Sequence, residues 1–224
     1  MSSARFPGKV LAPFKGKPII SHVLERLAEA IEPSRIIVLT SNEPTDDPLA
    51  YYLRSKNVAV FRGPLQDVFT RFRLCLLEKP CEWFLRISAD SPLFDPGILP
   101  GLMQATQNSS CDLVTTIFPR TFPKGQNAEL VRTSTFLTIN PSALSPHERE
   151  HVTPFFYNNS TRFRIVNVTS NEPRHAELSL AVDTIEDLHR LESLDSVPPF
   201  KNGPADRRSA LERSAFSNNV RVIQ

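Results

Sequence analysis

Two aspartates stand directly after predicted buried strands, and their chemistry is that of metal ligands. Asp90 follows the apolar run at 83–87, and Asp183 follows the run ELSLAV at 177–182. In open α/β sheets, ligands bind beyond the carboxyl ends of the strands, so the two carboxylates are expected to meet in one crevice. Carboxylates without cysteine or histidine suit Mg²⁺, which prefers oxygen ligands. The alternative is that each aspartate only caps the turn or helix that follows it.

The N-terminal loop combines small hydroxyl residues with cations and is a candidate phosphate site. It contains Ser2, Ser3, Arg5 and Lys9. Hydroxyls and backbone N–H groups can wrap a phosphate chain while arginine and lysine neutralise it. Lys17, just before a predicted helix, would add a third cation near the positive end of that helix. The alternative for cations so close to a terminus is an ordinary solvated surface.

The segment 147–151 reads H-E-R-E-H, which is the spacing of a zinc-protease helix. His147 and His151 could bind one zinc ion, with Glu148 as the general base. Pro154 follows closely and should end the long helix that such a site needs. No H-x-x-G-x-x-H pattern supplies a third ligand, although a lone glutamate farther along the chain could. The sequence therefore favours a short charged helix over a zinc site.

The elements that would position these residues alternate between strand and helix. Apolar residues recur with helical or strand spacing in every segment up to residue 118, and again after residue 176. The expected helices are 18–32, 46–56, 65–76, 96–107 and 183–194, and the expected strands are 35–40, 58–61, 83–87, 112–118 and 177–182. The less regular stretch 119–170 should include antiparallel strands. This pattern predicts an α/β sandwich with a mostly parallel sheet and helices on both faces.

Composition excludes several classes of protein. The chain has 224 residues, of which 7 are glycine, and no G-x-G-x-x-G or Walker-type loop is present. A net charge of +2 gives no basic footprint for nucleic acid, and no apolar run approaches the 18 residues of a membrane span. Three cysteines without a C-x-x-C pattern, and a start unlike a signal peptide, predict reduced thiols and a cytoplasmic location. We expect one domain over 1–197 and a C-terminal tail, 198–224, with one short helix.

Six blocks of sequence, taken in order, resemble the CMP-sugar cytidylyltransferases. The resemblance is to the acylneuraminate cytidylyltransferase-like branch, which includes spore-coat and surface polysaccharide biosynthesis, and it runs from residue 2 to about residue 195. The blocks are SSARFPGKVLAPFKGKPIISHVLERL, VFRGPLQDVFTRF, RISADSPLFDP, FPKGQNAELV, REHVTPFFY and LSLAVDTIEDL. The segment R-E-H-V-T-P belongs to this pattern, which leaves His147 as incidental.

The resemblance implies a nucleotidyltransferase of the GT-A-like, Rossmann-related fold. In such an enzyme a sugar hydroxyl attacks the α-phosphorus of CTP with Mg²⁺, pyrophosphate leaves, and a CMP-sugar results. The site residues carried over by position are Arg5, Lys9 and Lys17 near the phosphates, Ser2, Ser3 and Arg62 on the nucleotide side, Asp90 and Asp183 as magnesium ligands, and Asn127, Glu129 and His151 on the sugar side. A homodimer through the REHVTPFFY region is also expected.

One departure from the family concerns the first strand. Family members begin with an apolar strand ending near Q-A-R, whereas Met1 already stands within the loop that follows it. The sheet is therefore expected to lack its first, central strand, which would leave unpaired backbone groups on the neighbouring strands. Two alternatives to an active cytidylyltransferase remain: a GT-A glycosyltransferase that consumes a nucleotide sugar and, favoured by the missing strand, an impaired homologue that acts as a binding subunit.

Overall fold

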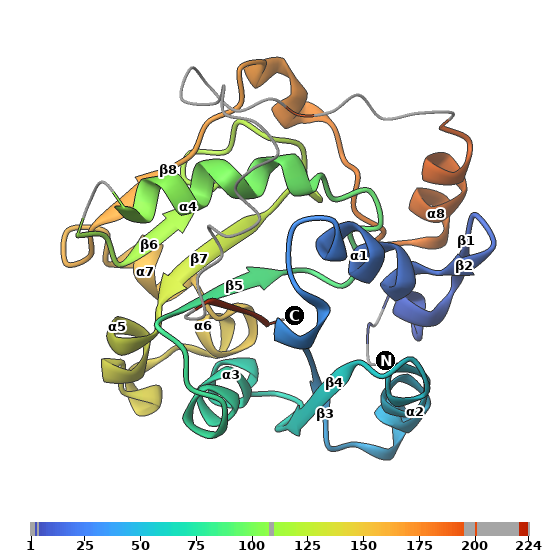
Figure 1. The fold of residues 1–224 in the computed structure, drawn as a ribbon, viewed down its shortest axis with the longest axis horizontal. Helices are drawn as coiled ribbons and strands as arrows, with labels where there is room; N and C mark the ends of the chain where they lie inside the picture. Colours follow the sequence, from blue (N-terminus) through green and yellow to red (C-terminus); the bar gives the residue numbers. More distant parts are fainter. Residues whose placement is uncertain (1–2, 4, 108–109, 195–199, 201–219, 224) are drawn as a thin grey trace.

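The fold is an α/β sandwich built on one mixed sheet of seven strands (Figure 1). The computed structural model describes residues 3, 5–107, 110–194, 200 and 220–223. Six of the described strands run in one direction, and β7 alone among them is reversed, because it is antiparallel to both β5 and β6. In sheet order the strands are β4 (Ala59–Gly63), β3 (Ile36–Ser41), β9 (Val220–Ile223), β5 (Trp83–Ile87), β7 (Ala128–Arg132), β6 (Leu113–Thr115) and β8 (Ile165–Asn167).

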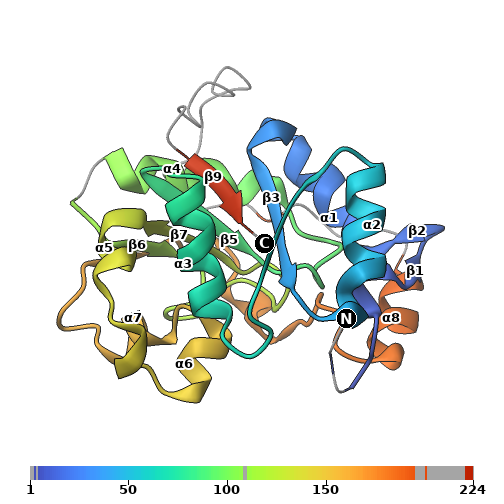
Figure 2. The same cartoon turned by 90° about the horizontal axis from the view of Figure 1, so that it is seen from below.

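Helices cover both faces of this sheet (Figure 2). On one face lie α1 (Ile19–Ala28), α2 (Asp47–Ser55), α4 (Leu99–Gln107) and α8 (Ile185–Glu192), and on the other lie α3 (Val68–Glu78), α5 (Thr133–Thr138), α6 (Pro146–His151) and α7 (Pro154–Asn158). The alternation along β3 shows the division, because Val38 packs with α1 and α2 while Ile37 packs with α3. A small hairpin of β1 (Pro13–Phe14) and β2 (Lys17–Pro18) precedes α1. The predicted fold class is confirmed.

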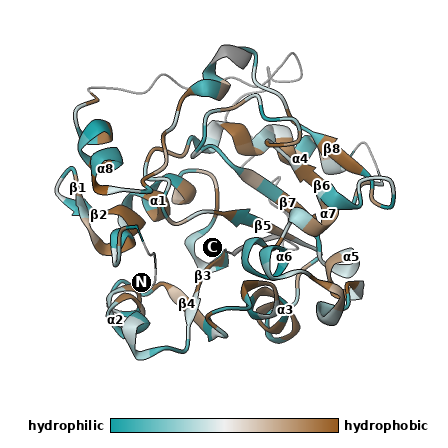
Figure 3. Ribbon diagram, turned by 180° about the vertical axis from the view of Figure 1, so that it is seen from behind, coloured by the Kyte–Doolittle hydropathy of each residue, from teal (hydrophilic) through white to brown (hydrophobic). Residues whose placement is uncertain are grey.

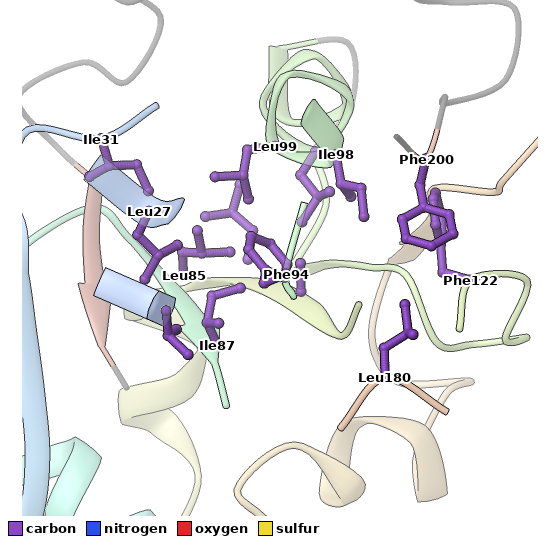
Figure 4. Packing of buried hydrophobic residues seen from close by; sticks show 14 of the residues in the cluster. Leu27, Ile31, Leu85, Ile87, Phe94, Ile98, Leu99, Phe122, Leu180 and Phe200 are labelled. Atoms are coloured by element: carbon purple, nitrogen blue, oxygen red, sulfur yellow. The ribbon is translucent and has the colours of Figure 1, made fainter. Parts of the chain in front are cut away.

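The larger hydrophobic core lies under α1 and α4 (Figure 4). Leu27 of α1 and Ile31, which follows that helix, pack in one cluster with Leu85 and Ile87 of β5. Phe94 and Leu99 belong to the same cluster. Helices α1 and α3 carry both hydrophobic and hydrophilic stretches in Figure 3, as expected of helices with one buried side. Within the described residues, no helix is long and apolar enough to cross a membrane.

The centre of the sheet differs from the expectation of a missing strand. Strand β9 lies between β3 and β5 and runs parallel to both, with Val222 opposite Ile36 on one side and Leu85 on the other. Strand β9 therefore pairs with four residues of β5 and with the first two residues of β3, at the centre of a buried sheet. Residues 220–223 of the expected tail belong to the sheet, and the helix expected in that tail lies outside the described residues.

The expected strand at 177–182 is wrong. The segment is extended but forms only an isolated bridge, between Ser179 and Lys124, after a short 3₁₀ helix at Pro173–Glu177. Its backbone hydrogen bonds go to loops, because Leu180 N–H donates to Lys124 O and Val182 N–H donates to Asp90 O. The helix that follows is confirmed as α8, with Thr184 as its N-cap. Asp183 thus stands at a loop junction and not at the end of a sheet strand.

Replacing Leu85 in the centre of β5 tests the packing of this core. Leu85 is 1% exposed, so Leu85→Ala leaves a cavity and should lower the free energy of unfolding by about 2–5 kcal/mol. Leu77→Ala on α3, where the side chain is 59% exposed, is the matched control and should change it by less than about 0.5 kcal/mol. Urea unfolding of both variants measures the difference, and equal effects would contradict this assignment of the core.

Candidate functional site

Lys9 lies between the two aspartates that the sequence singled out. Its Nζ donates to Asp90 Oδ2 at 2.7 Å and to Val182 O at 2.8 Å, and it reaches Asp183 Oδ1 at 3.4 Å. The side chains of Lys9 and Asp183 are each only 14% exposed. Three segments far apart in the sequence therefore meet at one ammonium group. The predicted convergence of the two carboxylates is present.

The loop that carries Lys9 is shaped for this position. Gly8 has a φ of 74°, a left-handed conformation that favours glycine, and it starts the 3₁₀ turn Lys9–Leu11. Ser3 accepts a hydrogen bond from Phe6 N–H at 3.3 Å, which closes the preceding turn. Ser2 lies outside the described residues. The loop is thus held by its own backbone and presents Lys9 inward.

Two further cations contact Asp183. Arg5 Nη2 lies 3.2 Å from Asp183 Oδ1, and Lys124 Nζ forms a short hydrogen bond to Asp183 Oδ2. With Lys9, three cations face the two carboxylates, so the cluster carries one excess positive charge (3 − 2). Burial alone would raise the pKa of Asp183, but Lys124, Lys9 and Arg5 together hold that pKa below its usual value. An excess of positive charge beside ionised carboxylates is suited to a polyphosphate.

Lys124 was not among the residues expected from the sequence. Its place depends on Gly125, which has a φ of 96° and lies so close to the chain at 180–181 that a Cβ would approach Leu180 C to 2.7 Å. Leu180 N–H donates to Lys124 O at 2.7 Å, which fixes the contact. In the sequence, the block FPKG shows a lysine directly before a glycine. That Lys124 points toward Asp183 follows only from the long-range pairing of its backbone with 178–180.

The carboxylate pair fits a magnesium ion that enters with phosphates. Within the described residues, no group of three or more histidine, cysteine or acidic side chains could hold a metal ion. Mg²⁺ needs no such group, since it is commonly held by one or two carboxylates, substrate phosphate oxygens and water. Asp90 and Asp183 can supply the two carboxylates. The lowered pKa of Asp183 keeps that carboxylate in the ionised form that a metal requires.

A cavity of about 330 Å³ opens beside this cluster at the carboxyl ends of β3 and β5. Val10, next to Lys9, and Ala89, next to Asp90, form the wall that adjoins the cluster. The remaining lining combines apolar groups with the polar side chains of Thr40, Gln66 and Arg71 and the acidic side chains of Asp46 and Glu150. Arg71 is buried and donates to Pro64 O, so it holds the loop after β4 against the cavity. The size and mixed lining suit a small polar ring system.

Arg62 and Lys17 lie apart from the cation cluster. Arg62 joins the end of β4 to the loop after β3, because it donates to Ser41 O at 2.7 Å and pairs with Asp47 at 2.6 Å. Lys17 pairs with Glu25 of α1 at 2.8 Å, and both side chains are more than half exposed. The structure therefore brings Arg5 and Lys9 to the two aspartates but does not bring Lys17 or Arg62 there.

Glu129 of β7 is the centre of a buried hydrogen-bond network on the face of the sheet that α7 covers. Its carboxylate, 1% exposed, accepts from Arg86, from Thr153 at 2.7 Å and from Tyr157 at 2.6 Å. Burial, followed by the charge of Glu129, raises the pKa of Tyr157, so the phenol remains a donor. The sequence signal for Arg86 was a charge inside the apolar run WFLRI. Thr153 and Tyr157 carried no separate signal.

The other two expected sugar-side residues lie near this network. Asn127 accepts a hydrogen bond from Arg120 at 2.6 Å, and both belong to the loop between β6 and β7. His151 is exposed at the end of α6. Burial, His147 and the charge of Arg86 together lower the pKa of His151 despite the opposing charge of Glu150, so the imidazole is neutral at pH 7.

A strained turn positions Thr153. Val152 has φ 74° and ψ −55°, and Thr153 N–H donates to His151 O across it at 2.9 Å, which makes a γ-turn. A β-branched residue in this conformation costs on the order of 1–3 kcal/mol. Val152 is fully buried, and the turn joins α6 to α7 so that Thr153 reaches Glu129. Strain is thus concentrated beside the network.

The H-E-R-E-H segment does not form a zinc site among the described residues. Glu148 completes a capping box with Ser145 and also accepts from Asn158, so its carboxylate serves the start of α6. The rings of His147 and His151 lie 4.5 Å apart, with no third ligand grouped with them in the described part of the chain.

Comparison with known proteins finds relatives along most of the chain. Over 200 residues the chain is 26% identical to the spore coat polysaccharide biosynthesis protein SpsF of Bacillus subtilis, covering 87% of this chain and 82% of that protein. A stretch of 99 residues is 33% identical to 8-amino-3,8-dideoxy-manno-octulosonate cytidylyltransferase of Shewanella sediminis, covering 42% of this chain and 39% of the relative.

Solved structures give the same result. A cytidylyltransferase from Leptospira borgpetersenii superposes with a TM-score of 0.80 at 29% identity, covering 86% of this chain and 81% of that one. The cytidylyltransferase family model matches residues 1–219. The resemblance drawn from the six sequence blocks is confirmed, and the chain belongs to the cytidylyltransferase family of nucleotidyltransferases.

Proposed function

We propose that the protein transfers CMP from CTP to a hydroxyl of an acidic sugar and releases pyrophosphate, with Mg²⁺ as cofactor. The observation that carries this proposal is the ammonium of Lys9 shared by Asp90 and Asp183 beside the 330 Å³ cavity. A carboxylate pair, an excess of cations and a cavity for a ring are what a magnesium nucleotide requires. Family membership selects CTP as that nucleotide.

The proposed reaction needs positioning and charge neutralisation more than covalent chemistry. Bound magnesium would neutralise phosphate charge and help to align the attacking oxygen with the α-phosphorus. Asp90 and Asp183 would hold it, which frees Lys9 to turn from the carboxylates to the phosphates. Arg5 and Lys124, which contact Asp183, would offset the charge that develops on the leaving pyrophosphate. No protein nucleophile takes part in this proposal.

The sugar is proposed to lie over the loop between β6 and β7. Arg120 and Asn127 present polar groups there, and Arg86 is 22% exposed beside them. Two arginines can pair with the carboxylate of a sugar acid. The names of the relatives point the same way, since an octulosonate is a sugar acid and SpsF is named for polysaccharide biosynthesis. We therefore place the substrate among octulosonate-like and neuraminate-like sugars of surface polysaccharides.

Asp183→Asn tests the metal-binding role. The amide keeps the shape but removes the charge, so turnover should fall by at least about 100-fold, while the chain stays folded with a lower unfolding temperature because the ion pairs of Asp183 are lost. Pyrophosphate release from CTP with a panel of octulosonates and neuraminate measures turnover. Glu29→Gln, which changes an exposed carboxylate at the C-terminal end of α1, is the control. Near-normal activity of folded Asp183→Asn would overturn the assignment, and release of a free nucleotide from a nucleotide sugar would favour a glycosyltransferase.

Lys124→Met tests the charge balance through the pKa of Asp183. Because the folded-state pKa is lowered, the ionised carboxylate stabilises the fold above its unfolded pKa, and this stabilisation is lost as the pH falls through the folded value. Without Lys124 the folded pKa should rise toward the ordinary aspartate value, so acid destabilisation begins at higher pH. Carboxyl-carbon NMR titration gives the pKa directly. Lys17→Met, which removes an ammonium paired with Glu25, should leave it unchanged.

Arg120→Gln tests the sugar side. Loss of a charged hydrogen bond to the sugar carboxylate should raise the KM for the sugar acid by roughly 10- to 100-fold, while the KM for CTP stays the same. Arg54→Gln on α2 is the control, because it removes an exposed guanidinium from an element outside the loop between β6 and β7. A parallel rise in both KM values would argue against a sugar-specific role.

A further inference from the structure

Arg71 of α3 is a buried cation whose hydrogen bonds leave part of its guanidinium unused. The residue is only 8% exposed. Its Nε donates to Pro64 O at 3.0 Å, and its Nη2 donates to Pro64 O and to Leu65 O. Among the described residues, no acceptor takes a hydrogen bond from Nη1, and no carboxylate forms an ion pair with the guanidinium. Buried donors of a charged group are costly without a partner, so a ligand that accepts from Nη1 would be stabilised.

The orientation of Arg71 is fixed by the end of β4 and by the loop that follows it. Gly63, the last residue of that strand, has no side chain, and a Cβ there would come within 2.8 Å of Arg71 Cγ. This close approach brings the guanidinium to the loop 64–67, whose carbonyl groups occupy Nε and Nη2. Arg71 is therefore held in place with Nη1 as the end that the loop does not engage.

Arg71 lines the cavity of about 330 Å³ beside the cation cluster. The lining also contains the carboxylates of Asp46 and Glu150, so the cavity offers acceptors as well as the donors of Arg71. Burial lowers the pKa of Arg71 despite the opposing charges of Asp46 and Asp67, but a guanidinium stays protonated in proteins. A ring bound in the cavity would meet both a charged donor and carboxylate acceptors.

We propose that Arg71 recognises the base of the nucleotide, with Nη1 donating to the O2 and N3 atoms of cytosine. The contact rests on the proposed function, because it requires that the cavity takes the base of CTP. Cytosine has adjacent acceptors at O2 and N3, and its amino group at C4 suits the carboxylates of the lining. Uracil instead has an N–H at position 3 and a carbonyl at C4, so it turns a donor toward Arg71 and an acceptor toward the carboxylates. The lining is thus complementary to cytosine and not to uracil.

The surroundings of a second arginine support this assignment. A base in the cavity leaves the phosphates at the cation cluster, because the cavity adjoins Lys9. Arg62, which the resemblance places on the nucleotide side, is not among the described residues that line the cavity. Each of its three side-chain nitrogens already donates, two of them to backbone carbonyls and one to Asp47. Arg71 therefore has the donors toward the cavity that Arg62 lacks.

Binding of CTP and of 3-deaza-CTP tests the contact from the ligand side. The analogue replaces the N3 acceptor by C–H and leaves the rest of the nucleotide unchanged. Calorimetry with Mg²⁺ should give a Kd for 3-deaza-CTP roughly 10- to 100-fold above that for CTP, since a buried charged donor is left without its acceptor. UTP should bind at least as weakly as the analogue. Equal affinity for CTP and 3-deaza-CTP would overturn the proposal.

Arg71→Met and Arg71→Lys test the contact from the protein side. Methionine keeps an apolar stem and removes every donor, so CTP and 3-deaza-CTP should bind almost equally. Lysine keeps the charge without the planar fork, so the ratio of the two Kd values should be lower than in the starting protein. If Arg71 only holds the loop, both nucleotides bind more weakly and the ratio is kept, which would contradict the proposal.

Arg73→Met is the matched control. It removes a guanidinium from the same helix that also donates to a backbone carbonyl, that of Leu137, but does not line the cavity. The ratio of the Kd values for 3-deaza-CTP and CTP should stay at the value of the starting protein.

The outcomes separate the base contact from the proposed reaction. If the preference for CTP over 3-deaza-CTP depends on Arg71 but no sugar of the panel yields pyrophosphate, the contact is supported and the proposed reaction fails. If pyrophosphate is released while Arg62→Gln, and not Arg71→Met, removes the preference, only the contact is overturned. Absence of CTP binding by the starting protein would overturn both.

Discussion

The hydrogen bonds at the centre of the sheet are the constraint on which the rest of the structure depends. A sheet covered by helices on both faces has no water to pair with its backbone, so β3 and β5 need a strand between them. β9 supplies it, and the cores under α1 and α3 can then close across the gap. Asp90 follows the carboxyl end of β5 and accepts a hydrogen bond from Lys9. The position of the cation cluster therefore depends on the same strand pairing.

Charge is the second constraint, and it acts between loops that the sheet brings together. Asp183 is mostly buried at a loop junction, and an unpaired carboxylate there would be costly. Lys9, Lys124 and Arg5 come from two different loops to offset it, which holds those loops against 182–184 before any substrate arrives. A polyphosphate with a magnesium ion can take over both halves of this arrangement, since it offers anions to the cations and a cation to the carboxylates. The charges of the site are therefore complementary to those of the proposed magnesium nucleotide.

Local sequence patterns predicted much of the fold because most elements are specified by near neighbours. The spacing of Ile20, Val23 and Leu27 defines α1, and WFLRI defines β5 to the residue. The run at 177–182 was mistaken for a strand because its apolar residues are buried, while its backbone partners lie in distant loops. β9 escaped prediction for the opposite reason: four residues carry little periodic signal, and the positions of β3 and β5 decide its place. Asp90, Asp183, Arg5 and Lys9 were found from type and order, whereas Lys124 depends on a contact that only the fold creates.

The network around Glu129 shows why a residue's place in a motif does not give its role. The resemblance puts Glu129 on the sugar-facing side, which suggests a group that touches the substrate. Its carboxylate is instead fully buried and already accepts from Arg86, Thr153 and Tyr157, so it has little capacity left for a ligand. What it can do is hold Arg86 in one orientation and fix the segment after the strained Val152. Arg86, held by Glu129, and Arg120, which donates to Asn127, are the half-buried cations on that side, and the proposed recognition of an acidic sugar depends on these two arginines.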